Sequence, residues 1–151
     1  MANGKSLSKV KKVIVFGVFD RLHDGHRYFL KSAGEYGELI VAVAPDEHVK
    51  ILKQKTPQEG EEKRIAALQD FLRDVTIVLG DKELGSYGVI RQLKPDIICA
   101  GYDQDKLTLD LKKKMKTGEI PKIPIIEIES FKPDKYHSTL LSHGDKDSTI
   151  R

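Results

Sequence analysis

Short apolar runs alternate with longer amphipathic segments along most of this chain. The apolar, largely β-branched runs predict buried strands at 12–17, 39–44, 75–79, 96–100 and 123–128. Apolar residues at helical spacing predict helices at 25–36, 46–52, 61–72, 86–94 and along the segment with Leu107, Leu111 and Met115. Such alternation is typical of a parallel sheet with right-handed crossovers. We therefore expect a doubly wound α/β domain whose five parallel strands lie in the order 3-2-1-4-5.

Two histidines lie where the first predicted strand turns into the first predicted helix. The strand ends in Gly17-Val18-Phe19-Asp20, and His23-Asp24-Gly25-His26 follows, with Asp24 as the expected N-cap. This is the carboxyl edge of the sheet, where open α/β sheets bind ligands and free helix N–H groups favour anions. Imidazoles there can donate to phosphate oxygens, and Gly25 leaves room for a triphosphate. Surface histidines or a two-histidine metal corner are the alternatives, and neither side chain is expected to matter for stability.

Length, charge and cysteine content limit the number of domains and the kinds of partner to expect. A length of 151 residues suits one domain, and we expect it at 12–141, between a flexible tail at 1–11 and a second tail at 142–151. The net charge of +3 fits an enzyme with anionic substrates and disfavours a nucleic-acid partner, including the alternative of an RNA-binding domain. Cys99 lies in an apolar run, which predicts a buried strand residue and suits a reducing cytoplasm. No stretch is apolar enough to predict a membrane span.

The segment from Gly17 to His26 resembles the HxGH signature of the cytidylyltransferase-like nucleotidyltransferases, and the resemblance extends over about residues 12–141. It implies a Rossmann-like nucleotidyltransferase fold. It also implies transfer of a nucleoside monophosphate from a nucleoside triphosphate to a phosphorylated small-molecule acceptor, with release of pyrophosphate and no covalent enzyme intermediate. Mg²⁺ would be bound through the triphosphate, with no metal site of the protein's own. Relatives of this size are commonly homodimers.

The resemblance and the position of each segment also assign roles to individual residues. The expected catalytic residues are His23, His26 and Lys53. The expected nucleotide-binding residues are Gly17, Val18, Phe19, Asp20, Gly25, Gly101, Tyr102, Asp103, Gln104, His137, Ser138 and Thr139. The expected substrate-binding residues are Lys55, Arg64, Lys132 and Lys135. For Lys53 and Lys55 the alternative is a solvated loop, for Arg64 a solvated helix charge, and for Asp103 a plain turn residue.

Two departures from the family pattern bear on the substrate. Val18 stands where most relatives have threonine, and the stretch before Ser138 lacks their arginine, so Lys132 or Lys135 would have to supply its charge. The pair of segments at 101–104 and 137–139 looks most like the archaeal-type FAD synthases, which join the adenylyl group of ATP to FMN. The alternatives are a cytidylyltransferase acting on CTP and glycerol 3-phosphate or a similar phosphorylated alcohol, and a nucleotide-binding domain without catalysis.

Overall fold

The computed structural model describes residues 10–54 and 56–131, in which five strands form one parallel sheet. The strands are β2 (Lys12–Gly17), β3 (Glu38–Val43), β4 (Thr76–Leu79), β5 (Ile97–Gly101) and β6 (Ile125–Ile128). Their order is β4-β3-β2-β5-β6, which is the predicted order 3-2-1-4-5. In the central strand, Val15 is in register with Val41 on one side and Cys99 on the other. The strands that the apolar runs predicted are therefore confirmed, with ends shifted by a residue or two.

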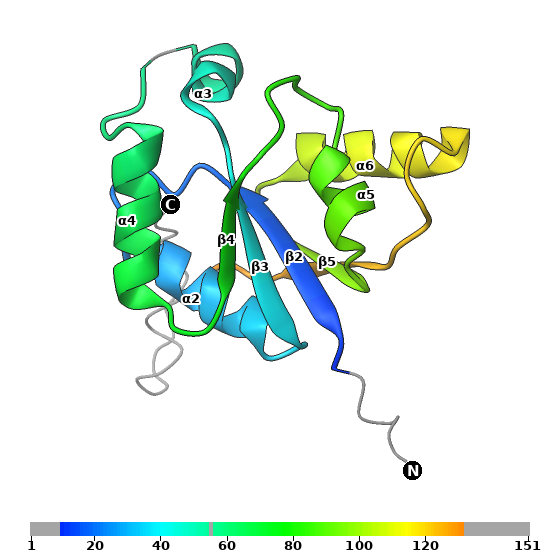
Figure 1. The fold of residues 1–151 in the computed structure, drawn as a ribbon, viewed down its shortest axis with the longest axis horizontal. Coiled ribbons are helices and arrows are strands. Elements are labelled where there is room, and N and C mark those ends of the chain that lie inside the picture. The colour runs from blue at the N-terminus through cyan, green and yellow to red at the C-terminus, as the bar shows by residue number, and fades with distance from the viewer. Residues whose placement is uncertain (1–9, 55, 132–151) are drawn as a thin grey trace, which may run out of the picture.

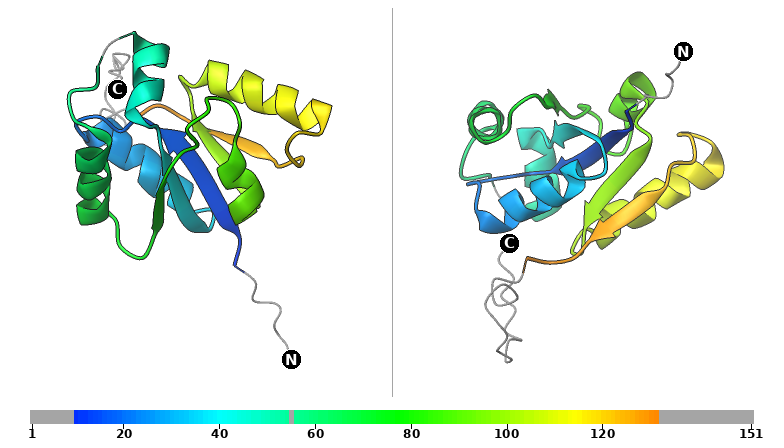
Figure 2. Two further views of the ribbon diagram at one scale, coloured as in Figure 1. Left: turned by 45° about the horizontal axis from the view of Figure 1, so that its top comes forward. Right: turned by 90° about the horizontal axis from the view of Figure 1, so that it is seen from below.

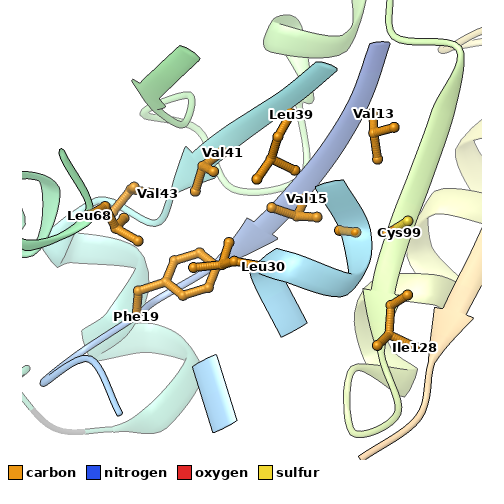
Figure 3. Packing of buried hydrophobic residues seen from close by; sticks show 11 residues of the cluster. Val13, Val15, Phe19, Leu30, Leu39, Val41, Val43, Leu68, Cys99 and Ile128 are labelled. Carbon is orange, nitrogen blue, oxygen red and sulfur yellow. The ribbon is translucent and has the colours of Figure 1, made fainter. Parts of the chain in front are cut away.

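The helices divide between the two faces of the sheet (Figures 1 and 2). They are α2 (Asp24–Gly34), α3 (Asp46–Lys53), α4 (Glu61–Phe71), α5 (Gly88–Leu93) and α6 (Asp105–Thr117). Buried residues of α2 and α4 pack on one face, as Leu30 and Leu68 show in Figure 3. Buried residues of α5 and α6, including Ile90 and Leu111, pack on the other face. Helix α3 lies beyond the carboxyl ends of the strands (Figure 1), where the candidate site is expected.

Side chains and prolines explain where the observed elements differ from the predicted ones. Helix α5 begins at Gly88, not at 86, because the Asp81 carboxylate accepts hydrogen bonds from the Gly88 and Val89 N–H groups at 2.6 and 3.2 Å. Burial of Asp81 works against its ionisation, but bonds from Ser86, Gly88 and Val89 outweigh that effect and hold the pKa of the carboxyl below its usual value. Strand β6 begins at Ile125, directly after Pro124, which has no N–H for a sheet.

No helix in the described part of the chain has the length and apolar character needed to span a membrane. The limits proposed for the domain and its two tails remain predictions.

Candidate phosphate-binding site at the carboxyl edge

The two histidines of the motif cap the first turn of α2. His23, not Asp24 as predicted, is the N-cap, and its Nδ1 accepts a hydrogen bond from the Gly25 N–H at 3.1 Å. In return, the Nδ1 of His26 accepts from the His23 N–H at 3.2 Å. This reciprocal arrangement is a capping box built from two imidazoles, in which each ring satisfies a backbone donor at the helix end. Asp24 is instead the first residue of the helix and pairs with Arg27 on the surface at 2.9 Å.

The capping box also determines where the imidazole protons lie. A neutral imidazole has one donor and one acceptor nitrogen, so a ring that accepts at Nδ1 has its proton at Nε2. The two rings stack with their centroids 3.7 Å apart and their planes 18° apart. The motif thus presents two Nε2–H donors side by side at a helix N-terminus, where the helix dipole also favours negative charge.

The loop between β2 and α2 is strained and tightly packed. Phe19 and Arg21 both have φ of 53°, in the left-handed region that non-glycine residues rarely adopt. The Phe19 ring is buried and lies edge-on to the His26 ring, with centroids 5.5 Å apart. A Cβ on Gly17 would come within 2.7 Å of the Phe19 ring, so a larger residue there requires the buried ring to move. Gly17 therefore has a packing role, because it leaves room for the ring that contacts His26. Its expected contact with the nucleotide stays a prediction.

Asp20 ties this loop to the segment that precedes α4. Its Oδ2 accepts from the Gln58 N–H at 2.7 Å, and its Oδ1 accepts from the Glu59 N–H at 2.9 Å. The Glu59 carboxylate accepts in turn from the Arg21 N–H at 3.3 Å. The carboxylate predicted to contact the nucleotide thus binds backbone donors, and its observed contacts are those of a loop anchor.

Arg64 lies beneath the same loop and is fully buried. Its Nε donates to the Glu59 carbonyl at 3.0 Å, and one terminal nitrogen donates to the carbonyls of Val18 and Ala44 at 2.9 and 2.8 Å. The other terminal nitrogen pairs with the Asp46 carboxylate at 2.7 Å. This burial excludes the alternative of a solvated helix charge, and the expected substrate contact stays a prediction. The physical reason is that the carboxyl ends of the strands leave carbonyls that need buried donors.

Across the site, Gln104 joins the ends of β2 and β5. Its side-chain carbonyl accepts from the Gly101 N–H at 2.8 Å, and its side-chain N–H donates to the Phe16 carbonyl at 2.8 Å. These two strands are the ones between which the connections diverge to opposite faces, which is where the crevice of such a sheet opens. Both groups of the Gln104 amide are thus bonded within the protein, and its predicted contact with the nucleotide stays a prediction. Tyr102 is half-buried and Asp103 is exposed at the same edge.

The connection between β4 and α5 forms a further wall of this edge. The Nε2–H of buried His48 in α3 donates to the Lys82 carbonyl at 2.7 Å. At the other end of the connection, the Tyr87 hydroxyl donates to Asp110 of α6 at 2.6 Å. Burial and the neighbouring Asp110 carboxylate raise the pKa of Tyr87. Sequence reasoning missed these contacts because the partners are distant in sequence and one acceptor is a backbone carbonyl.

Other predicted residues lie elsewhere or outside the described residues. Lys53 is the last residue of α3, not part of a loop. The predicted site residues outside the described ranges are Lys55, Lys132, Lys135, His137, Ser138 and Thr139. The predicted roles of these residues, and of the other predicted site residues, stay predictions. Cys99 is fully buried in β5, as predicted, and burial raises the pKa of its thiol to about 11.

A depression of about 480 Å³ lies at the opposite, amino edge of the sheet; its lining includes Arg91, Lys94, Pro95, Asp96 and Lys122, and it shares no residue with the predicted site. Among residues 10–54 and 56–131, no three histidine, cysteine or acidic side chains are grouped so that they could hold a metal ion.

Known proteins that are similar to this chain in sequence or in structure identify its family. The FAD synthase of Pyrococcus horikoshii is 45% identical over 107 residues, which cover 70% of this chain and 72% of that protein. The FAD synthase of Thermococcus sibiricus is 39% identical over 125 residues, covering 78% and 84% of the two chains. The solved structure of the lipopolysaccharide core biosynthesis protein from Thermoplasma volcanium is 33% identical, with a TM-score of 0.71, and covers 82% of this chain and 99% of that one. The sequence pattern of the cytidylyltransferase-like family matches residues 14–142, and the chain belongs to that family.

Proposed function

We propose that this protein is an adenylyltransferase that joins the adenylyl group of ATP to FMN, yielding FAD and pyrophosphate. The observation that carries the proposal is the capping box of His23 and His26, which presents two Nε2–H donors at the N-terminus of α2. The choice of ATP and FMN among the reactions of the family rests on the relatives named FAD synthase. The family and these relatives favour catalysis over binding alone.

The reaction needs positioning and charge stabilisation more than covalent chemistry. An oxygen of the FMN phosphate attacks the α-phosphorus of ATP, a new P–O bond forms, and the bond to the β-phosphate breaks in line with it. Negative charge then grows on the α-phosphoryl oxygens and on the departing pyrophosphate. In our proposal the Nε2–H groups of His23 and His26 donate to these oxygens, and the N-terminus of α2 adds its dipole. No nucleophilic side chain of the protein is required.

Magnesium enters this proposal as a companion of the substrate. The described residues form no protein cage for it, whereas Mg²⁺ commonly binds through phosphate oxygens and water, with only one or two carboxylates. When bound, it would neutralise part of the triphosphate charge. Lys53, Lys55, Lys132 and Lys135 are our candidates for holding the triphosphate and the acceptor phosphate.

A matrix of substrates tests the proposal. The purified protein is mixed with Mg²⁺ and either ATP or CTP, and each nucleotide is combined with FMN or glycerol 3-phosphate. Pyrophosphate release and chromatography of the nucleotide product are the readouts. We expect FAD and pyrophosphate from ATP with FMN only. Turnover of CTP with glycerol 3-phosphate alone would refute the choice of substrates, and no turnover in any combination would refute the proposed activity.

We further propose that the protein is a homodimer and acts in the cytoplasm. Both proposals rest on the resemblance to the family, and the buried, unpaired thiol of Cys99 suits a reducing compartment. Light scattering at micromolar concentration should give twice the 17.0 kDa mass of the chain. A mass of one chain would exclude the dimer and leave the proposed chemistry unaffected.

A further inference from the structure

Arg64 is the one fully buried charged residue within the described part of the chain, and three of its four hydrogen bonds go to backbone carbonyls of separate segments. Those segments are the loop after β2, the end of β3 and the loop before α4. A buried guanidinium costs free energy unless its donors are satisfied, and here the carbonyls and Asp46 satisfy them. The family resemblance implies a substrate contact for Arg64, whereas the observed contacts join Arg64 to the protein backbone. One of these contacts lies in the loop after β2, which leads to the histidine motif.

The bond to Val18 has a consequence on the opposite side of the peptide. The Val18–Phe19 peptide is trans, as are all the peptide bonds of the described residues. In a planar trans peptide the carbonyl and the following N–H point in opposite directions. Because the Val18 carbonyl points at Arg64, the Phe19 N–H points away from the buried guanidinium. The ring of the same residue, Phe19, contacts the His26 ring. The Phe19 N–H is therefore part of the loop that directly precedes the histidine motif.

We propose that Arg64 is a positioning residue: it fixes the Val18–Phe19 peptide so that the Phe19 N–H donates to a phosphate oxygen of the bound nucleoside triphosphate. The left-handed conformation of Phe19 supports this inference, because that strained backbone needs a local partner to hold it. One terminal nitrogen of the guanidinium donates to two carbonyls, while its other nitrogens bond Glu59 and Asp46. A lysine has a single ammonium nitrogen and cannot make all of these bonds at once. The inference rests on the proposed function only in taking a nucleoside triphosphate as the ligand.

Isotope labelling can observe this N–H directly. Protein labelled with ¹³C at the valine carbonyl and with ¹⁵N at phenylalanine gives carbonyl-filtered amide signals only for Val-Phe pairs. The chain has two such pairs, Val15-Phe16 and Val18-Phe19, so Phe16 in β2 is an internal reference. The variant Val18→Thr removes the Phe19 signal and thereby assigns it. We expect ATP with Mg²⁺, without FMN, to shift the Phe19 signal and to leave the Phe16 signal nearly unchanged.

Substitution of Arg64 then tests the positioning role. In Arg64→Lys we expect the Phe19 shift on ATP addition to be lost and the ATP affinity, measured by calorimetry, to fall about tenfold or more, as for loss of a hydrogen bond to a charged oxygen. Arg91→Lys is the matched control, because Arg91 is exposed and lies at the opposite edge of the sheet. Leu68→Ala, in the same helix and fully buried, should lower the melting temperature without changing the ATP affinity.

A milder variant covers the case in which Arg64→Lys does not fold. Asp46→Ala removes the carboxylate that pairs with the guanidinium but leaves Arg64 in place. We expect it to weaken ATP binding at least threefold and to reduce the Phe19 shift. The proposal is overturned if a folded Arg64→Lys protein binds ATP with the original affinity and Phe19 shift, or if Asp46→Ala changes neither. Because these mixtures contain no FMN, and CTP is tested in parallel, absence of FAD formation would refute the proposed function and not this one.

Discussion

Substitutions that preserve the cap can separate the two roles of His23 and His26. An asparagine at position 23 is a strong N-cap, and its side-chain oxygen can accept from the Gly25 N–H as the imidazole does. A glutamine at position 26 occupies the N3 position of a capping box and can reach back to the His23 N–H. His23→Asn and His26→Gln therefore keep the helix cap but replace the imidazole Nε2–H with the N–H₂ of a shorter or more flexible amide, which lies at a different position. His23→Ala and His26→Ala remove both the cap and the donor.

The magnitudes follow from the two contacts. Loss of an N-cap side chain costs about 1 kcal/mol, which corresponds to a fall of roughly 2–4 °C in melting temperature for a chain of this size. Loss of a donor that stabilises developing charge slows turnover on the order of 10²-fold or more. We therefore expect all four variants to lose turnover to this degree, while only the alanine variants lose stability. The capping contacts thus lead us to expect a small loss of stability, where the sequence alone led us to expect almost none.

Two measurements on the same samples separate the capping role of the histidines from their role as donors. Thermal melts followed by circular dichroism report the cap, and pyrophosphate release with ATP, FMN and Mg²⁺ reports the donor. Near-normal turnover in His23→Asn and His26→Gln would show that catalysis does not need an imidazole Nε2–H at these positions. Unchanged melting temperatures in both alanine variants would show that the capping box contributes nothing measurable to folding.

Three further predictions concern the surroundings of the site. Gly17→Ala should cost about 1–3 kcal/mol in a melting experiment, because its Cβ would overlap the Phe19 ring, whereas Gly34→Ala, with open space around its Cβ, should not destabilise. Gln104→Glu should lower the melting temperature and turnover, since a carboxylate cannot donate to the strand-end carbonyl that the amide now binds. Finally, the raised pKa of Cys99, about 11, means that the unfolded chain loses this proton first as the pH rises. Stability from this group is present below pH 9 and lost towards pH 11, so Cys99→Ala should flatten the alkaline fall in melting temperature.

The fold was predictable because its signals are local. Each strand is a short apolar run, and the alternation with amphipathic segments leads to a parallel sheet whose order the structure confirms. The ends of elements were less predictable, as α5 shows. Its start depends on a carboxylate seven residues upstream, and no pattern of apolar spacing indicates such a contact.

The site was predictable only in part, for a related reason. His23 and His26 are three residues apart, so one helical turn brings them together and the motif is visible in the sequence. Arg64 and Gln104 instead bind carbonyls that are 46 and 88 residues away. Every residue has a backbone carbonyl, so such a partner leaves no trace in the residue types. Both were predicted to contact ligand, and the structure shows that both bind the protein's own backbone.

The contacts of the acidic residues explain how a phosphate site can exist beside several carboxylates. Asp20 accepts from two backbone N–H groups, Asp46 pairs with the buried Arg64, and Asp24 pairs with Arg27 on the surface. Their negative charge is therefore partly compensated by donors within the protein. The histidine pair and the N-terminus of α2 therefore lie among less uncompensated negative charge than the sequence of this segment suggests. Removing the partner of one of these carboxylates should therefore weaken triphosphate binding, because the uncompensated carboxylate would repel the phosphates.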